Sequence, residues 1–245
     1  MKAFAKTSLL VLLNFAVLLS ICLTAAAQQN RERNTKKVRE AARQSAKAAR
    51  VFDEIMGTHE KSIPRDLLDK AEAVAVFPSV LKAGFIVGGR GGSGVISRRV
   101  AGGWSAPAFF DLGGGSIGLQ IGAASTDYIL LFMNENAVES LLSDKFEIGG
   151  EGSAAAGPVG RSASASTDVK LNAQILSYSR SRGAFAGLEL KGVVIKPDNE
   201  DNLQVYSMTA RDILTGANKI SMDKMPEGVR VFPETLARYS TRKIK

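Results

Sequence analysis

The chain has 245 residues and a formal net charge of +8, with 45% hydrophobic and 23% charged residues. These proportions are typical of ordinary globular proteins. It contains one cysteine, Cys22, and one histidine, His59, which excludes a disulfide framework and the common zinc sites.

Residues 1–27 are typical of a secretory signal peptide. Two lysines lie within the first six residues, an apolar segment follows over 9–23, and small residues precede a cleavage site after Ala27. The alternatives are an uncleaved N-terminal anchor helix and a lipoprotein signal at Cys22. The signal predicts an exported protein, periplasmic or secreted and peripheral to a membrane. No later segment is long and apolar enough to span a bilayer.

After the signal we expect a flexible start over 28–33 and one domain over 34–245, which ends in a basic helix or tail. The domain begins with a helix over about 34–56, because apolar and small residues recur there at three- and four-residue steps. Pro64 is predicted to begin a second, short helix that runs to about Glu72.

The net positive charge of the mature chain comes from one N-terminal segment, most of which lies in the first helix. Residues 31–50 carry eight basic and two acidic side chains, whereas residues 51–245 carry 22 of each sign. A basic amphipathic helix suits an anionic lipid surface. Alternatively, the helix docks on the domain through its alanines and Phe52, and its basic side is only solvated.

From Val74 to Lys196 the chain is predicted to be mainly β-strand, and its many glycines mark bends or bulges. Such bends curl a sheet, so we expect an α+β fold. It would have a strongly curved antiparallel sheet, either a barrel or a tight sandwich, with the N-terminal helix and further helices beside it. The other expected elements are a helix over 136–143, a hairpin over 177–196 turning at Arg182-Gly183, a helix over 202–215 ending at Gly216, and a last helix or tail over 234–242.

The segment 82–107 is dense in glycine, and its residues 89–94 match a dinucleotide-binding fingerprint. The fingerprint requires a helix after the last glycine, but Val95 to Val100 continues as a strand. We therefore interpret the glycines as a tight β-hairpin with positive φ. The only tryptophan, Trp104, is predicted to fill the core rather than to bind a ligand.

The motifs that suggest catalysis or metal binding lack their partners. Ser116 lies in a nucleophile-elbow match, but it leads into a strand and the only histidine is upstream. The acidic loop from Asp198 to Asp201 is a candidate calcium site whose spacing differs from that of an EF-hand. The sequence therefore predicts a protein that is not an enzyme and needs no cofactor or metal.

Several blocks of the chain follow one another in the order found in a known family. They are Lys82–Phe85, Gly92–Val95 with Arg98 or Arg99, Gly103–Pro107, Gly118–Gly122, Ala156–Arg161, Ser177–Gly183, Phe185–Gly187, Leu190–Gly192 and Ile213–Gly216. Through these blocks, residues 35–218 resemble the SYLF domain, also called the actin-patch-protein-like domain. The family includes exported bacterial lipid-binding proteins and parts of eukaryotic membrane-trafficking proteins. The resemblance implies a small α+β fold and lipid binding, with phosphoinositides as the ligands of eukaryotic relatives and lipids such as phosphatidylglycerol or cardiolipin for an exported protein.

The leading interpretation is an exported, non-enzymatic protein that binds anionic phospholipid headgroups or a membrane surface through its basic N-terminal helix. The second is a structural or protein-interaction module of the cell envelope with no direct lipid role. Nucleic acid is not expected as a partner, because the basic residues are not interleaved with aromatic ones. The predicted lipid-binding residues are Lys36, Lys37, Arg39, Arg43, Lys47 and Arg50 on the helix, and Lys82, Arg90, Arg98 and Arg99 around the glycine-rich segment.

Overall fold

The structure is a computed structural model that describes residues 34–58, 62–143, 145–150, 153–160, 173–181, 184–188, 190, 192–216, 220 and 225–240. For 83–87 and 116–123 the description covers the backbone alone. The predicted signal peptide and the predicted flexible start therefore lie outside the described residues.

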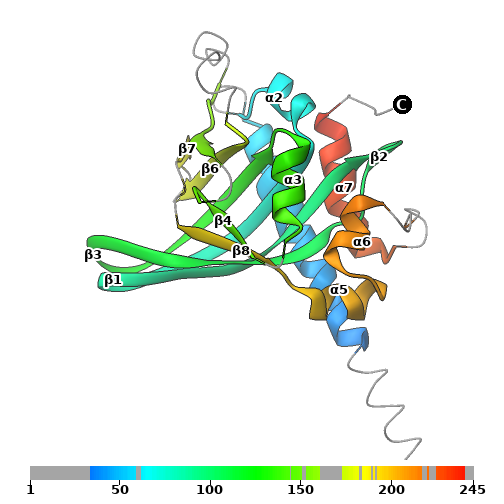
Figure 1. The fold of residues 1–245 in the computed structure, drawn as a ribbon, viewed down its shortest axis with the longest axis horizontal. Helices are drawn as coiled ribbons and strands as arrows, with labels where there is room; N and C mark the ends of the chain where they lie inside the picture. Colours follow the sequence, from blue (N-terminus) through cyan, green and yellow to red (C-terminus); the bar gives the residue numbers. More distant parts are fainter. Residues whose placement is uncertain are drawn as a thin grey trace, which may run out of the picture.

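The fold is α+β, as predicted: an antiparallel-rich sheet curls into a nearly closed barrel and helices flank it (Figure 1). Its centre is a pair of long antiparallel strands, β1 (Ala73–Val100) and β3 (Ala108–Phe132). In Figure 1 this pair extends from the body of the molecule as a curved ribbon. The first half of β1 lies against its second half, because a Cβ added to Gly94 would lie 2.4 Å from the carbonyl oxygen of Val76.

The predicted glycine hairpin is wrong in place and in conformation. Gly89, Gly91, Gly92 and Gly94 lie inside β1, and none of them has a positive φ. Gly92 and Gly94 are needed where the first half of β1 lies against its second half, because an added Cβ would lie 3.0 Å or less from Val80 or Val76. At Gly89 and Gly91 an added Cβ would meet nothing closer than 3.9 Å. The chain reverses at Gly102 and Gly103, whose φ angles are 93° and 149°, and the short strand β2 (Gly103–Trp104) then pairs with the end of β1.

The remaining strands extend the two ends of the long ribbon. Near its open end, β3 pairs with β6 (Ile175–Ser181), which in turn pairs with β5 (Ala154–Ala156) and β7 (Ala184–Gly187). Near the Gly102 turn, β3 pairs with β8 (Val193–Pro197), which pairs with β4 (Phe146–Ile148). The predicted hairpin pairing is thus confirmed for β6 and β7, although its predicted turn at 182–183 lies outside the described residues, whereas β8 belongs to the other end of the sheet.

Most helices lie where the sequence predicts them. The N-terminal helix spans 34–56, α2 is Arg65–Lys70, and α3 is Glu135–Leu141. The last helix, α7 (Glu227–Tyr239), starts earlier than expected and contains Pro233.

The single helix predicted over 202–215 is wrong. Two helices, α5 (Asn199–Tyr206) and α6 (Ala210–Thr215), occupy this region. They are separated at Ser207, which has a left-handed φ of 57°, and Thr209 then starts α6 by forming a capping box with Asp212. Gly216 ends α6 at a φ of 68°, as the sequence predicts.

Both faces of the sheet are buried, which explains why β1 begins with a continuous apolar run. Ala75 and Phe77 pack in a core with α3, α6, β4 and β8, whereas Val74 and Val76 pack in a second core with the N-terminal helix, α2 and α7. In Figure 1, α3 lies in front of the strands and the N-terminal helix passes behind them. The second core therefore fixes how the N-terminal helix is oriented.

Candidate anionic-surface site

The N-terminal helix is docked on the body by a face of small residues. Ala41, Ala48 and Phe52 are at most 1% exposed. Its contact with α7 is close, because a Cβ added to Gly228 would lie 2.7 Å from the Cβ of Ala42. The apolar face is therefore used for packing and is not available for insertion into a membrane.

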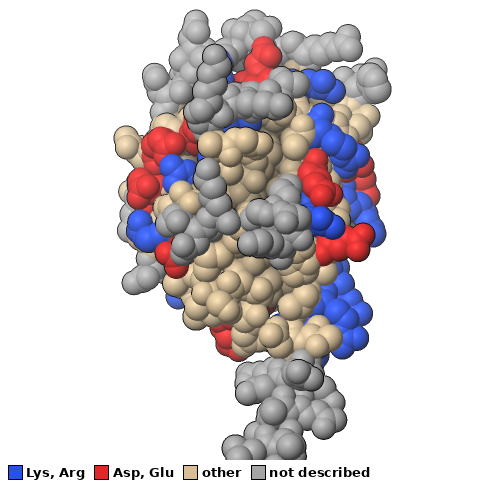
Figure 2. Space-filling model, turned by 90° about the vertical axis from the view of Figure 1, so that its right-hand side faces the viewer, with Lys and Arg blue, Asp and Glu red and all other residues tan. Residues whose placement is uncertain are grey.

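The opposite face of this helix carries the basic stripe: Lys36, Arg39, Arg43, Lys47 and Arg50. All five side chains are exposed. Their spacing of three or four residues places them along one side of the helix. Among the described residues the only ion-pair partner of the stripe is Glu40, whose carboxylate lies 3.9 Å from the Lys36 ammonium. Figure 2 shows Lys and Arg side chains along one edge of the molecule, with Asp and Glu side chains among them.

Lys37, also predicted as a site residue, does not belong to the stripe. Its ammonium donates a hydrogen bond to the Asp201 carboxylate at 2.6 Å, and this bond raises the pKa of Lys37. The pair connects the N-terminal helix to α5. Lys37 therefore has a local partner for its charge.

The four site residues predicted around the glycine-rich segment are not brought together as one patch. Arg98 forms an ion pair with Glu135. Lys82 and Arg90 are partly exposed, and Arg90 Nε is enclosed without a hydrogen bond in the described part of the chain. Arg99 is only 3% exposed.

Arg99 is a structural residue, and its prediction as a surface ligand group requires correction. Its guanidinium donates to the carbonyl oxygens of Ala71 and Leu68 at 2.9 and 2.8 Å and to Ser240 Oγ at 2.6 Å. It also lies 4.3 Å from the ring centre of Trp104. Trp104 is buried, as predicted, so this pair belongs to the core.

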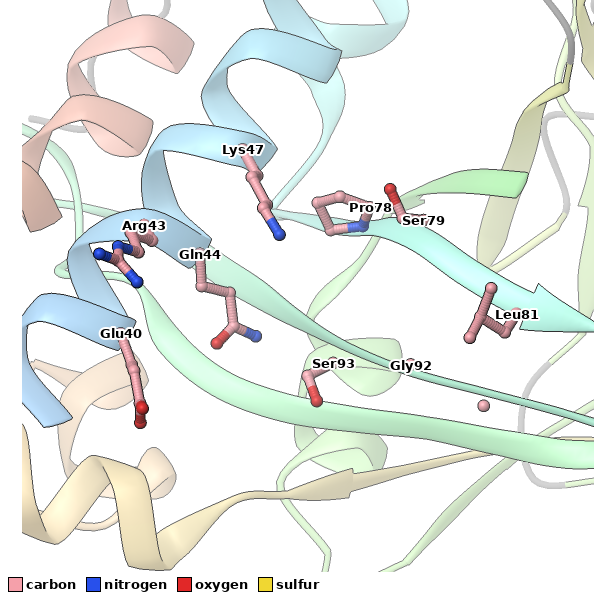
Figure 3. A pocket seen from close by; sticks show the side chains of 10 residues that line it. Glu40, Arg43, Gln44, Lys47, Pro78, Ser79, Leu81, Gly92 and Ser93 are labelled. Atoms are coloured by element: carbon pink, nitrogen blue, oxygen red, sulfur yellow. The ribbon is translucent and has the colours of Figure 1, made fainter. Parts of the chain in front are cut away.

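A pocket of about 400 Å³ lies between the basic stripe and β1. The helix contributes Arg43 and Lys47 from the stripe, and the strand contributes an exposed apolar residue, Leu81 (Figure 3). The pocket is therefore charged on its helical side and partly apolar on its strand side. Its other lining residues are Glu40, Gln44, Pro78, Ser79, Gly91, Gly92 and Ser93.

Hydrogen bonds hold the two walls of this pocket in place. The Gln44 side-chain amide donates to the carbonyl oxygen of Gly94 at 3.0 Å, which ties the helix to β1. Ser79 lies in a bulge of β1 with a left-handed φ of 54°, and its N–H donates to Asp127 at 2.8 Å. Asp127 also binds Arg180, which pairs with Glu54 of the N-terminal helix. The network therefore fixes the strand wall and the helix wall relative to each other.

The acidic loop does not have the form of a calcium site. The Asp198 side chain accepts from the Asp201 N–H and caps α5, while Asp201 binds Lys37. Within the described residues, no group of three His, Cys, Asp or Glu side chains could hold a metal ion. Among the described helices, none has the length and apolar character needed to cross a bilayer. His59 and the side chain of Ser116 lie outside the described residues.

Comparison with known proteins identifies the family. Residues 113–239, about half of the chain, match the Ysc84 family model, described as "Las17-binding protein actin regulator". The chain belongs to the Ysc84 or SYLF family. The resemblance in the sequence is thereby confirmed.

Two groups of relatives indicate how much of the chain is shared. The SH3 domain-containing YSC84-like protein 1 of Rattus norvegicus is 36% identical over 181 residues, which cover 71% of this chain and 53% of the relative. The LAS seventeen-binding protein 3 of Saccharomyces cerevisiae is 37% identical over 163 residues, which cover 64% of this chain and 35% of the relative. The chain therefore spans about half or less of the length of these SYLF relatives.

The sequence predicts the helical side of the pocket but not its strand side. Arg43 and Lys47 are recognisable from charge and helical period alone. Ser79 and Leu81 are not, because they approach the helix only after β1 has folded back on itself. A weak signal is Pro78-Ser79 within an otherwise apolar strand, which favours an interruption of regular pairing.

Proposed function

We propose that this SYLF protein binds anionic membrane surfaces through the basic stripe, with the N-terminal helix remaining docked on the domain. The observation that supports this most is the stripe itself: five exposed cations on one helical face, four of them without an ion-pair partner in the described residues. Each Lys or Arg near an anionic membrane contributes about 1 kcal/mol. Binding is electrostatic, because the apolar face of the helix is buried.

The proposal includes export to the periplasm or the cell exterior, with the protein peripheral to a membrane. Residues 1–27 support it by their composition. The family description and the names of the relatives refer to binding and regulation, which supports a binding protein rather than an enzyme.

Charge reversal on the stripe tests this proposal. The variant Arg39→Glu/Arg43→Glu/Lys47→Glu should lose most binding to anionic vesicles in co-sedimentation. Its matched control is Arg65→Glu/Lys145→Glu/Lys196→Glu, which changes the net charge equally at exposed positions away from the helix. Equal loss in both variants would mean that only total charge matters. Wild-type binding by a folded stripe variant would contradict the proposal.

The second candidate function is a protein-interaction module, favoured by the family description "Las17-binding protein actin regulator". Isothermal titration calorimetry of the purified protein with Las17 tests this candidate. Saturable binding without any binding to anionic vesicles would favour it over the membrane proposal.

A further inference from the structure

We propose that the pocket between the basic stripe and β1 is a headgroup site for a phospholipid that carries hydroxyl groups beside a single phosphate, such as phosphatidylglycerol. This inference rests on the proposed membrane function and adds selectivity to it. The general attraction would come from the whole stripe. The choice among anionic lipids would come from the pocket.

The phosphate would be held by Arg43 and Lys47. These residues are one helical turn apart, both line the pocket, and neither has an ion-pair partner in the described residues. Figure 3 shows the Lys47 side chain extending from the helix toward the strand wall, with Arg43 beside it on the same helix. An arginine and a lysine provide several charge-assisted hydrogen bonds to phosphate oxygens.

The rest of the polar lining offers acceptors as well as the Ser79 hydroxyl and the Gln44 side-chain amide. Glu40 contributes a carboxylate, an acceptor-only group when ionised, which also lies 3.9 Å from the Lys36 ammonium. The Ser93 hydroxyl already donates to Asp111 at 2.7 Å, so its remaining capacity is as an acceptor. The Gln44 NH₂ uses one of its two N–H groups on Gly94, and the amide oxygen is a further acceptor. The ligand should therefore carry donors in addition to its phosphate.

Hydroxyl groups satisfy these acceptors better than an ammonium group or a second phosphate. An ammonium would enter a pocket that already holds two cations, Arg43 and Lys47. A second phosphate would lie near the Glu40 carboxylate and be repelled by it. A glycerol headgroup avoids both penalties.

A membrane lipid fits this pocket better than a soluble glycerol phosphate. Leu81 lines the pocket and, at 61%, is the most exposed large apolar side chain among the described residues. Pro78 extends the apolar wall. A lipid would supply apolar atoms for Leu81 at the membrane interface, whereas a free glycerol phosphate would leave it in water.

Vesicles of equal charge test the selectivity. Phosphatidylglycerol and phosphatidylserine are each mixed at the same mole fraction into phosphatidylcholine, and the ratio of the two dissociation constants is measured. We expect the wild type to prefer phosphatidylglycerol about fivefold, the equivalent of one hydrogen bond. Glu40→Ala/Ser93→Ala keeps every cation of the stripe and should bind both vesicles with a ratio near one. The control Glu234→Ala, an exposed position on α7, should keep the wild-type ratio.

The outcomes separate this inference from the proposed function. A wild type that binds neither vesicle contradicts the proposed function. A wild type that binds both equally, or a folded double variant that keeps the preference, overturns the headgroup site alone. Equal affinity for free glycerol 3-phosphate and for phosphatidylglycerol vesicles would assign the pocket to a soluble ligand and also overturn the inference.

Discussion

Ser45 of the N-terminal helix donates a hydrogen bond of 2.7 Å to the carbonyl oxygen of Val229 in α7. In a regular helix this carbonyl would accept from the N–H of residue 233, but that residue is a proline and has no N–H. The Ser45 hydroxyl, which is fully buried, therefore supplies from the N-terminal helix the donor that Pro233 lacks. This hydrogen bond joins the N-terminal helix to α7 at the position where the proline interrupts the bonding of α7.

Ser45→Ala should destabilise the protein by about 1–3 kcal/mol, because the carbonyl of Val229 is left without a partner in a buried interface. In a Pro233→Ala background the helix can supply its own N–H, so the same substitution should cost less. Chemical denaturation of the four proteins in this double-mutant cycle measures the coupling. Equal costs in the two backgrounds would show that Ser45 does not replace the proline's donor.

Gly94→Ala should prevent folding or cost more than about 3 kcal/mol, because the new methyl group would lie 2.4 Å from the Val76 carbonyl oxygen and the Phe77 ring. Gly89→Ala is the matched control in the same strand. A Cβ there meets nothing within 4 Å, so the substitution should be neutral or slightly stabilising. Circular dichroism during thermal unfolding compares the two variants, and similar melting temperatures would contradict the folded-back arrangement of β1.

Binding to anionic vesicles should weaken strongly as salt is raised from about 50 to 500 mM, because the Debye screening length falls from about 14 to about 4 Å over this range. Insertion of an apolar face would depend much less on salt. The dissociation constant at several sodium chloride concentrations provides the measurement. Salt-independent binding would mean that the N-terminal helix leaves its docked position and inserts.

Asp198 should make the protein less stable as pH rises, the opposite of the usual effect of a carboxyl group whose pKa is lowered by folding. Its burial raises the pKa of the carboxyl above 3.8, so the folded protein binds this proton more tightly than the unfolded chain does. Its contribution to stability therefore falls as pH rises from about 3.8 through the folded-state pKa. Asp198→Asn keeps a capping side chain without the charge, so its stability relative to the wild type should improve between about pH 4 and 7.

Urea unfolding of both proteins across this range measures the difference. Asp198→Ala serves as the control, because it loses the cap of α5 as well and should cost about 1 kcal/mol. A constant difference between Asp198→Asn and the wild type would contradict the raised pKa.

The sequence predicted those features that depend on local pattern. Helical period identified the N-terminal helix and both of its faces, and Gly216 was recognised as a helix end. It could not predict that β1 folds on itself, because glycine permits both a tight turn and a close contact. The burial of Arg99 was also not predictable, since its carbonyl partners belong to a helix about 30 residues earlier in the chain.

The contact between the first and last helices joins residues 184 positions apart. Contacts at this separation form late, because the chain must close a long loop before they contribute to stability. The interface for the N-terminal helix is thus incomplete until α7 has been synthesised. In a newly made chain the helix that carries the basic stripe would be fixed in its final position only after the whole domain has folded.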